Sequence, residues 1–442
     1  MKMPRLLPLF MAISATFALP AQAQSLVDLY ESARGFDASY QSAKSQFNAT
    51  VAKAEQARAA ILPTANLGFV KSRSNQDYTS ATGNRDYSYG TETTTLSASQ
   101  PLYRPANRAS YQQGTKQFDL AQAQLLAADQ DLIVRVSQAY FDVLASQDNL
   151  AFVKAQKTAV AEQLASAKRN FEVGTSTITD TREAQARFDL VVAQEIAAEN
   201  DLRVKKIALD QLVGKTEAQP QQLAQPLTLP TVVPSDVNQW VQQSSTSHPS
   251  IKQAQIALDV AQLETKKAEA GHKPTLDLTA NMNAINNLDG SSSGPGSSRV
   301  NASSIGLSFN LPLFAGFSTQ NRIKETLALE DKARNDLEGA KRAVAQGTRT
   351  AFFGVLSGQG QVKALEAAEA SSQSALDANK LGYQVGVRIN IDVLNSQSQL
   401  FDTKAKLAKA RYDVLLGSLK LRQANGTLKA EDLSGVNALL AK

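Results

Sequence analysis

The second half of this chain repeats the first half at a nearly constant offset, and this repetition limits what the chain can fold into. Residues 139–144 (AYFDVL) return 212 positions later as residues 351–356 (AFFGVL). Residues 62–67 (LPTANL) pair at an offset of 211 with residues 273–278 (KPTLDL). A unit of about 210 residues is therefore used twice, and a tandem copy within one chain usually builds a pseudo-symmetric object. Pseudo-symmetry of this kind is more typical of pores than of catalytic sites.

The N-terminus carries the three parts of a secretory signal peptide. Lys2 and Arg5 form a basic start, residues 6–19 are an apolar run, and residues 21–23 (AQA) are a small-residue cleavage site. We expect cleavage after Ala23 and export of the mature chain. The apolar run is shorter than the roughly 20 residues that a transmembrane helix needs, and no later segment approaches that length. Any membrane crossing is therefore expected from β-strands.

The composition excludes several classes of function. The chain has no cysteine, so it does not use the disulfides that an exporting compartment allows. Its formal net charge is +5, and it contains no basic block of the kind that binds nucleic acid. The two histidines, His248 and His272, lie far apart in the sequence, so we expect no metal site. No nucleophile–histidine–acid pattern and no glycine-rich phosphate loop is visible, so we expect neither an enzyme nor a cofactor.

Proline placement predicts very long helices. Proline is absent from residues 106–219 and again from residues 313–442, and both runs are rich in alanine, glutamine, leucine, lysine and glutamate. Gly174 and Gly386 interrupt these runs at equivalent places in the two repeats, and glycine is the usual residue after a helix end. Each repeat is therefore predicted to contain a long antiparallel helical hairpin with its tip at that glycine.

Shorter helices and a linker complete the predicted domain organisation. One shorter helix is expected at the start of each repeat, over residues 25–60 and 235–271. A stretch with four prolines separates the repeats and is predicted to be a linker at the equator of the molecule. The predicted boundaries are residues 1–23 for the signal peptide, 24–214 for repeat 1, 215–234 for the linker and 235–442 for repeat 2.

Between the first helix and the long hairpin, each repeat contains two segments in which apolar and small polar residues alternate. Their length, about 9–10 residues, and their pattern are those of transmembrane β-barrel strands. The four predicted strands are residues 64–71, 93–101, 275–283 and 304–311. Residues 72–92 and 286–301, which are rich in serine, glycine, asparagine and tyrosine, are predicted to be the loops that join each pair.

Four strands cannot close a barrel on their own. In lipid, an open sheet edge leaves backbone groups without hydrogen-bond partners, so open edges are excluded. The smallest membrane barrels have eight strands. Two, three or four chains would supply 8, 12 or 16 strands, and the periodicity alone leaves these three alternatives open. Tyr103, Phe314 and Phe317 follow predicted strand ends, where the aromatic girdle of such a barrel would lie.

The chain resembles the TolC family of outer-membrane efflux and secretion channels. The resemblance rests on paired motifs that occur in the same order in both repeats. These are PT at 63–64 with PTLDLT at 274–279, QPL at 100–102 with LPL at 311–313, and the tip motifs RNFEVG at 169–174 with ITD at 178–180 and GYQVGVRINIDVL at 382–394. The resemblance implies a mixed α and β membrane protein. It would be a homotrimer whose 12-stranded outer-membrane β-barrel, with four strands per chain, continues into a long periplasmic α-helical barrel of coiled-coil hairpins.

The resemblance also implies a function and partners. The expected function is a passive trimeric exit duct in the outer membrane that docks with a periplasmic adaptor (membrane fusion protein) and an inner-membrane transporter. It would contact outer-membrane lipid and serve efflux of small molecules or type I protein secretion. The alternative is a structural periplasmic coiled-coil spacer with no conducting pore. The alternating strands favour the duct, because a spacer needs no such alternation at transmembrane length.

In this family the helix tips close the periplasmic end of the duct, and the resemblance places four residues of this chain there. Tyr383 would tie to Asp180, and Arg388 would tie to Thr179 and Asp180 of a neighbouring chain. The simpler alternative for Asp180 is capping of the helix that follows the tip, and Thr177 and Thr179 are also candidate caps.

The resemblance places Asp392 at the pore entrance, where three copies would form an acidic ring. The family pattern has a second acidic residue one turn later, but in this chain that position is Asn395. We therefore expect half of the ring charge and weaker binding of cations at the entrance. The alternative role for Asp392, and for the neighbouring Asn390, is capping of the second hairpin's returning helix.

Overall fold

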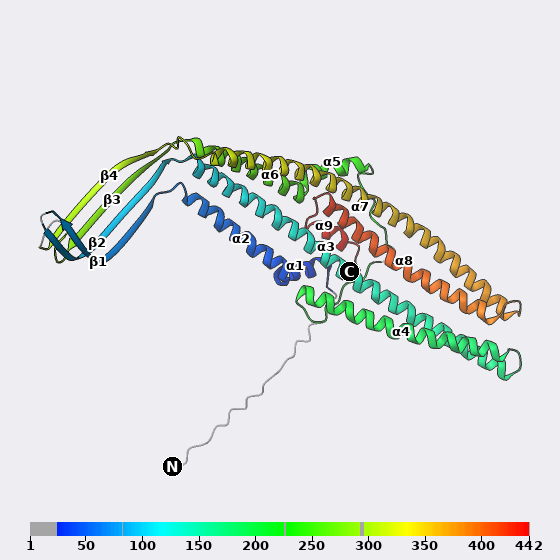
Figure 1. The fold of residues 1–442 in the computed structure, drawn as a ribbon. Helices are drawn as coiled ribbons and strands as arrows, with labels where there is room; N and C mark the ends of the chain where they lie inside the picture. Colours follow the sequence, from blue (N-terminus) through cyan, green and yellow to red (C-terminus); the bar gives the residue numbers. More distant parts are fainter. Residues whose placement is uncertain (1–23, 82, 225–226, 292–295, 442) are drawn as a thin grey trace, which may run out of the picture.

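The chain forms an elongated molecule with a β-sheet at one end and helical hairpins at the other (Figure 1). This computed structural model describes residues 24–81, 83–224, 227–291 and 296–441. The predicted signal peptide and the centre of the predicted loop 286–301 lie outside the described residues. Within those described ranges, no helix is both long and apolar enough to cross a membrane.

One antiparallel sheet combines strands from both repeats. Its strands are β1 (Thr64–Ser80), β2 (Gly83–Tyr103), β3 (Thr275–Asn287) and β4 (Ser298–Asn310), in the spatial order β1-β2-β3-β4. The repeats meet along β2 and β3, which are paired from Thr91 with Asn287 to Tyr103 with Leu276. The sheet is therefore a joint product of the two repeats.

The strands of both repeats are longer than predicted. The predicted loop over residues 286–301 is shortened at both ends by β3 and β4, and the predicted loop over residues 72–92 is wrong. Most of that segment continues the β1–β2 ladder, from Lys71 with Glu92 to Ser80 with Gly83. The prediction used an apolar face as its signal, and this part of the ribbon is polar on both faces. Threonine and tyrosine favour strands, and no proline interrupts the ladder, so backbone pairing continues without an apolar face.

Both long hairpins are confirmed. The first consists of α3 (Pro105–Glu172) and α4 (Ile178–Val213), and the second of α7 (Ser318–Gln384) and α8 (Asn390–Ala424). At 1.5 Å per residue, the 68 residues of α3 span about 100 Å. Gly174 and Gly386 lie at the two tips, and both have a φ of +79°. Glycine adopts this left-handed conformation without the steric cost that a Cβ atom imposes.

The shorter first helix of each repeat is broken in two, which corrects the prediction of single helices. The segments are α1 (Leu26–Phe36), α2 (Ala38–Ala59), α5 (Val237–Ser247) and α6 (Pro249–Glu269), and η1 (Ala270–His272) extends the last of them. Asp37 accepts the Tyr40 N–H at 2.8 Å, and His248 Nδ1 accepts the Ser250 N–H at 3.1 Å. Each side chain caps a new helix, and this local bond competes with continuation of the old one.

The largest core lies at the waist of the molecule, where α1, α3, α4, α8 and the short α9 (Asp432–Asn437) pack together. Tyr140 is fully buried there, and its hydroxyl donates to the Gln221 carbonyl at 2.9 Å. Gln24 forms a backbone bridge with Pro220, and Leu223 forms one with Leu440. The predicted linker is thus held at the waist beside both ends of the described chain (Figure 1).

Candidate functional site

The sheet presents apolar side chains that no described part of the chain covers. Leu67 and Phe69 on β1, and Ile305, Leu307 and Phe309 on β4, are all exposed, and Ile305 is 76% exposed. They alternate along each strand with small polar residues. Large exposed apolar surface on a strand of this pattern is typical of a lipid-facing surface.

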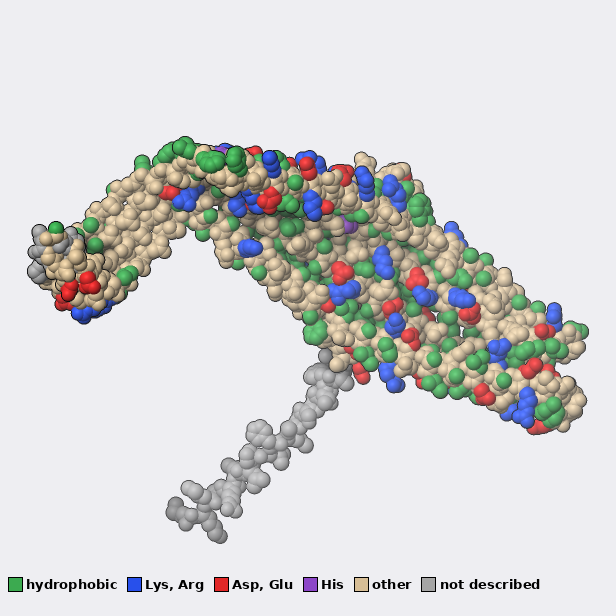
Figure 2. Space-filling model, in the orientation of Figure 1, with side chains coloured by type: hydrophobic (Ala, Val, Ile, Leu, Met, Phe, Trp, Pro, Cys, Tyr) green, Lys and Arg blue, Asp and Glu red, His purple; other side chains and the backbone are tan. Residues whose placement is uncertain are grey.

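A second apolar cluster lies where the sheet meets the helices. Leu313 is 90% exposed, and Phe314 and Phe317 are exposed beside it with their rings in an edge-to-face arrangement 5.4 Å apart. Figure 2 shows apolar side chains gathered at this bend. Tyr103, the third predicted girdle residue, is the last residue of β2 and is also exposed. Aromatic residues at this level are typical of a membrane–water interface.

An ion pair between a half-exposed arginine and a buried aspartate joins the sheet to the helices. The guanidinium of Arg104, just before α3, donates from Nε and Nη2 to the two carboxylate oxygens of Asp277 on β3, at 2.7 and 2.6 Å. Asp277 is 6% exposed. A bidentate pair fixes both distance and orientation, so it holds the start of the first hairpin against a strand of the second repeat.

The two hairpin tips meet around a cavity of about 640 Å³. Three of the predicted gate residues line it, namely Asp180, Tyr383 and Arg388. Thr179 lies beside it in the first turn of α4 and is exposed. The structure therefore brings the predicted gate residues from both repeats to one place.

Asp180 is held tightly within its own tip. Its carboxylate accepts hydrogen bonds from the Ser176 hydroxyl at 2.8 Å and from the Thr177 hydroxyl and N–H at 2.8 and 3.0 Å. Burial alone would raise the pKa of Asp180, but these hydrogen bonds outweigh it, so its pKa lies below the usual range. Thr177 caps α4 and Asp180 completes the capping box, whereas Thr179 is not a cap.

Tyr383 and Arg388 have partners within their own chain. The Tyr383 hydroxyl accepts a hydrogen bond from Asn170 Nδ2 at 3.3 Å, and Arg388 Nη1 lies 3.7 Å from an Asp392 carboxylate oxygen. In the described part of the chain, no hydrogen bond joins Tyr383 to Asp180. That tie, and the tie of Arg388 to a neighbouring chain, stay predictions.

The sequence predicted Asn390 or Asp392 as the N-terminal cap of α8, and this prediction is wrong. Ile389 occupies the N-cap position, and its side chain makes no capping hydrogen bond. Asn390 is fully buried instead: it accepts a hydrogen bond from Gln163 and donates to the Asp180 carbonyl at 3.3 Å. Asn395 accepts a hydrogen bond from Arg187 Nη2 at 2.8 Å. Both asparagines therefore connect α8 to the first hairpin.

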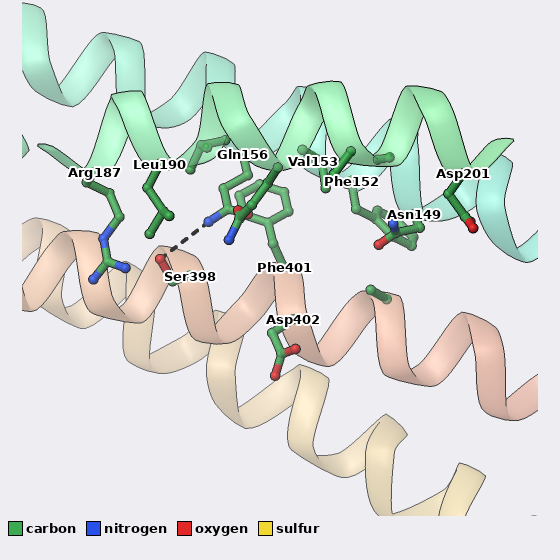
Figure 3. Close-up of a pocket in the computed structure, with 15 residues that line it drawn as sticks. Asn149, Phe152, Val153, Gln156, Arg187, Leu190, Asp201, Ser398, Phe401 and Asp402 are labelled. Atoms are coloured by element: carbon green, nitrogen blue, oxygen red, sulfur yellow. Dashed lines mark hydrogen bonds between the residues drawn. The ribbon is translucent and has the colours of Figure 1, made fainter. Parts of the chain in front are cut away.

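A second cavity, of about 490 Å³, lies between α4 and α8, farther from the tips and toward the waist (Figure 3). Phe152 and Phe401 line it together with Arg187 and Asp402. Gln156 Nε2 donates to the Ser398 hydroxyl at 3.3 Å across it. The cavity combines aromatic surface with charges of both signs.

Both repeats of the chain match one known protein family. The family model described as outer membrane efflux protein matches residues 29–215 and 240–427, once in each repeat. The chain belongs to the outer membrane efflux protein family. It is 34% identical to outer membrane protein TolC of Vibrio cholerae over 99% of this chain and 98% of that protein. It is 30% identical to alkaline protease secretion protein AprF of Pseudomonas aeruginosa, over 99% of this chain and 92% of that protein.

Solved structures share the fold of this outer membrane efflux protein. VceC of Vibrio cholerae aligns with a TM-score of 0.77 at 22% identity, covering 91% of this chain and 96% of VceC. The CmeC channel of Campylobacter jejuni aligns with a TM-score of 0.77 at 16% identity, covering 94% and 89%. The expected fold class, four strands and two long helical hairpins in two repeats, is confirmed.

Membership of the outer membrane efflux protein family also confirms the resemblance to the TolC family and the expected location in the outer membrane. The chain is an exit duct of that membrane, and the alternative of a structural spacer is not favoured. The family is one of transport channels.

The sequence did not reveal three polar contacts between distant segments: Arg104 with Asp277, Arg187 with Asn395, and Asn390 with Gln163. One signal was available for the first, because Asp277 is a charged residue in a strand whose other polar residues are small. The other two depend on which faces of two separate hairpins come together, and no local pattern carries that information.

Proposed function

We propose that this outer membrane efflux protein acts as a homotrimer whose three sheets close one barrel of twelve strands and whose hairpins form a hollow periplasmic α-barrel. The observation that carries the proposal is the sheet itself. It contains four strands and ends in β1 and β4, and each of these pairs with only one described strand. Open edges are excluded in lipid, so other chains must supply the partners.

The exposed faces of the two outermost helices, α4 and α7, fit the same assembly. The exposed face of α7 carries small residues at helical spacing, such as Gly347 and Gly354, with nothing near the position of a Cβ atom. The exposed face of α4 carries larger apolar residues, such as Ile196, Val204 and Ile207. In a closed ring, the α4 edge of one chain meets the α7 edge of the next, so larger side chains can pack against smaller ones.

Mass in mild detergent tests this proposal. We expect light scattering to give three times the mass of the mature chain, and we expect the purified protein to conduct ions in planar bilayers. The expectation follows from the open edges of the sheet, which only other chains can satisfy. A monomeric mass, or recovery of the protein from the soluble periplasmic fraction, would overturn it.

The duct is closed at the hairpin tips by Asp180, Thr179, Tyr383 and Arg388. Two of these side chains line the tip cavity from α7 and the turn that follows it, and Asp180 lines it from α4. The first repeat offers the smaller Ser176 at the position equivalent to Arg388. The second repeat therefore supplies the longer polar side chains, and we assign it the moving part of the gate.

The α4–α8 cavity receives a helical segment of a periplasmic adaptor, which joins the duct to an inner-membrane transporter. Its aromatic residues and its charges of both signs support this role. The names of the relatives include a secretion protein and an efflux pump outer membrane protein. The cargo is accordingly small molecules, secreted protein or both, as selected by the transporter.

Replacing the tip contacts should open the channel. We expect Tyr383→Phe combined with Arg388→Ser to raise single-channel conductance in planar bilayers, because the Asn170 hydrogen bond and the Arg388 charge are both lost. Lys380→Ser is the matched control, since it removes a charge that lines the same cavity. Equal conductance in all three proteins would place the closure elsewhere.

Replacing Asp392 should change the ion selectivity of the channel, which the same bilayer recordings can measure. Carboxylates around a narrow entrance favour cations, so Asp392→Asn should shift the reversal potential under a salt gradient. The shift should be largest at low salt, because the Debye length falls from about 10 Å at 0.1 M to about 3 Å at 1 M. An unchanged reversal potential would mean that Asp392 does not face the pore.

A further inference from the structure

Close to the tips, one charged side chain links the two hairpins; farther from the tips Asp148 and Lys420 also do so, through Tyr412 and Gln138. Arg187 extends from α4 toward α8 at the tip end of the α4–α8 cavity (Figure 3). Its Nη2 donates to Asn395 Oδ1 at 2.8 Å. The bond joins residues 208 positions apart, one from each repeat.

Each hairpin is held together internally by ion pairs. Lys157 lies 2.5 Å from Glu195 across α3 and α4, and Arg411 lies 2.9 Å from Glu366 across α7 and α8. Two further pairs of this kind are Lys154 with Glu199 and Lys404 with Glu369. Opposite charges across each pair of helices favour movement of each hairpin as one unit.

The contacts between the hairpins are of a different kind. Among the described residues, no ion pair joins α3 or α4 to α7 or α8. Near the tips the hairpins are joined by hydrogen bonds, which are Gln156 with Ser398, Gln163 with Asn390, Asn390 with the Asp180 carbonyl, Asn170 with Tyr383, and Arg187 with Asn395. Of these bonds, only the last includes a charged side chain, and charge-assisted bonds are stronger than neutral ones.

We propose that Arg187 and Asn395 form a clasp that holds the two hairpins together in the closed duct and opens when the hairpins separate. This inference rests on the proposed closure at the tips and adds Arg187 as a positioning residue of that gate. The neutral amide of Asn395 is important here. A carboxylate at this position would form an ion pair with the guanidinium, which would be stronger and more sensitive to salt.

The clasp changes what Asn395→Asp is expected to do. Read from the sequence alone, the new carboxylate would add a second acidic ring and increase cation preference. In this structure it lies within reach of Arg187 and pairs with it. We therefore expect Asn395→Asp to lower the conductance at low salt, and high salt to restore it.

Single-channel recordings of the full-length protein test the clasp. Arg187→Ala and Asn395→Ala should each raise the ratio of open to closed time by about three- to tenfold, the factor expected for loss of one solvent-exposed hydrogen bond from a charged group. The double variant should match either single variant, because both remove the same contact. Arg187→Lys keeps a donor and should restore part of the closure. Additive effects, or no effect of Arg187→Ala, would overturn the clasp.

A crosslink gives a second test that does not depend on the stability of the alanine variants. The chain has no cysteine, so Arg187→Cys with Asn395→Cys carries the only two thiols. A short, reducible thiol crosslinker should lower conductance, and a reductant should restore it. The crosslinked protein should run as a monomer on a denaturing gel, because the clasp lies within one chain. A crosslinked dimer, or conductance unaffected by the crosslink, would contradict it.

The tip variant separates failure of the clasp from failure of the proposed gate. If Tyr383→Phe with Arg388→Ser opens the channel and the Arg187 variants do not, the gate stands and the clasp is wrong. If neither opens it, the closure proposed at the tips is itself wrong. Detergent mass of each variant confirms that the compared proteins are assembled.

Discussion

Gly426→Ala is expected to destabilise the assembled protein far more than Gly386→Ala does. The two glycines have nearly the same backbone conformation, with φ values of +78° and +79°. A Cβ atom on Gly426 would lie 2.4 Å from the Cα atom of His248, whereas nothing lies within 4 Å of a Cβ atom on Gly386. Gly386→Ala therefore costs only the roughly 1–2 kcal/mol that a residue with a Cβ atom pays in the left-handed backbone conformation. Gly426→Ala adds a clash with backbone, for a total of roughly 2–5 kcal/mol.

The temperature at which the detergent-solubilised protein loses its helical circular dichroism measures this difference. Gly386→Ala is the matched control, because it isolates the cost of the backbone conformation. If the two variants lowered the unfolding temperature by similar amounts, the break between α5 and α6 would be able to move away from the end of α8. That result would contradict the close packing of Gly426 against His248.

Arg104→Ala should destabilise the junction between the sheet and the helices. It leaves the Asp277 carboxylate, which is 6% exposed, without its bidentate partner. The Arg104 side chain is 43% exposed, so solvent screens part of the interaction, and leaving the buried Asp277 carboxylate without its two donors costs roughly 1–3 kcal/mol. We expect a large drop in the thermal midpoint and in the yield of folded protein recovered from membranes.

Lys71→Ala is the control for this prediction. It removes another ion pair in the described part of the sheet, between Lys71 and Glu92, in which the lysine side chain is 63% exposed. Exposed pairs contribute about 0–1 kcal/mol, so this variant should resemble the parent. Asp277→Asn in the Arg104→Ala background should recover part of the loss, since it removes the buried charge. No recovery would mean that Arg104 acts through packing and not through its charge.

The helices could be predicted from the sequence because their signals are local. Long runs without proline, ended by Gly174 and Gly386, marked both hairpins, and the structure confirms them. The breaks at Asp37 and His248 were missed, because each rests on one side chain that caps its own backbone. The length of β1 and β2 was missed because backbone pairing needs no apolar face.

The candidate site was only partly predictable. Asp180, Tyr383 and Arg388 were selected by resemblance, and they line one cavity. Their partners within the chain, such as Asn170 for Tyr383, follow from the packing of one hairpin against the other. Arg187 lies in a helix rich in charged residues, and nothing in its neighbourhood distinguishes it from a solvated surface residue.

The waist has a consequence for quality control during biogenesis. Leu440, which pairs with Leu223, is synthesised after the helices of the waist, and it is buried with Leu433 and Val436. A chain that ends early leaves the linker without this backbone partner and exposes the apolar surface beneath it. Truncated copies should therefore fail to mature and fall to proteolysis before they enter a ring. We therefore expect the waist to exclude shortened subunits from the ring.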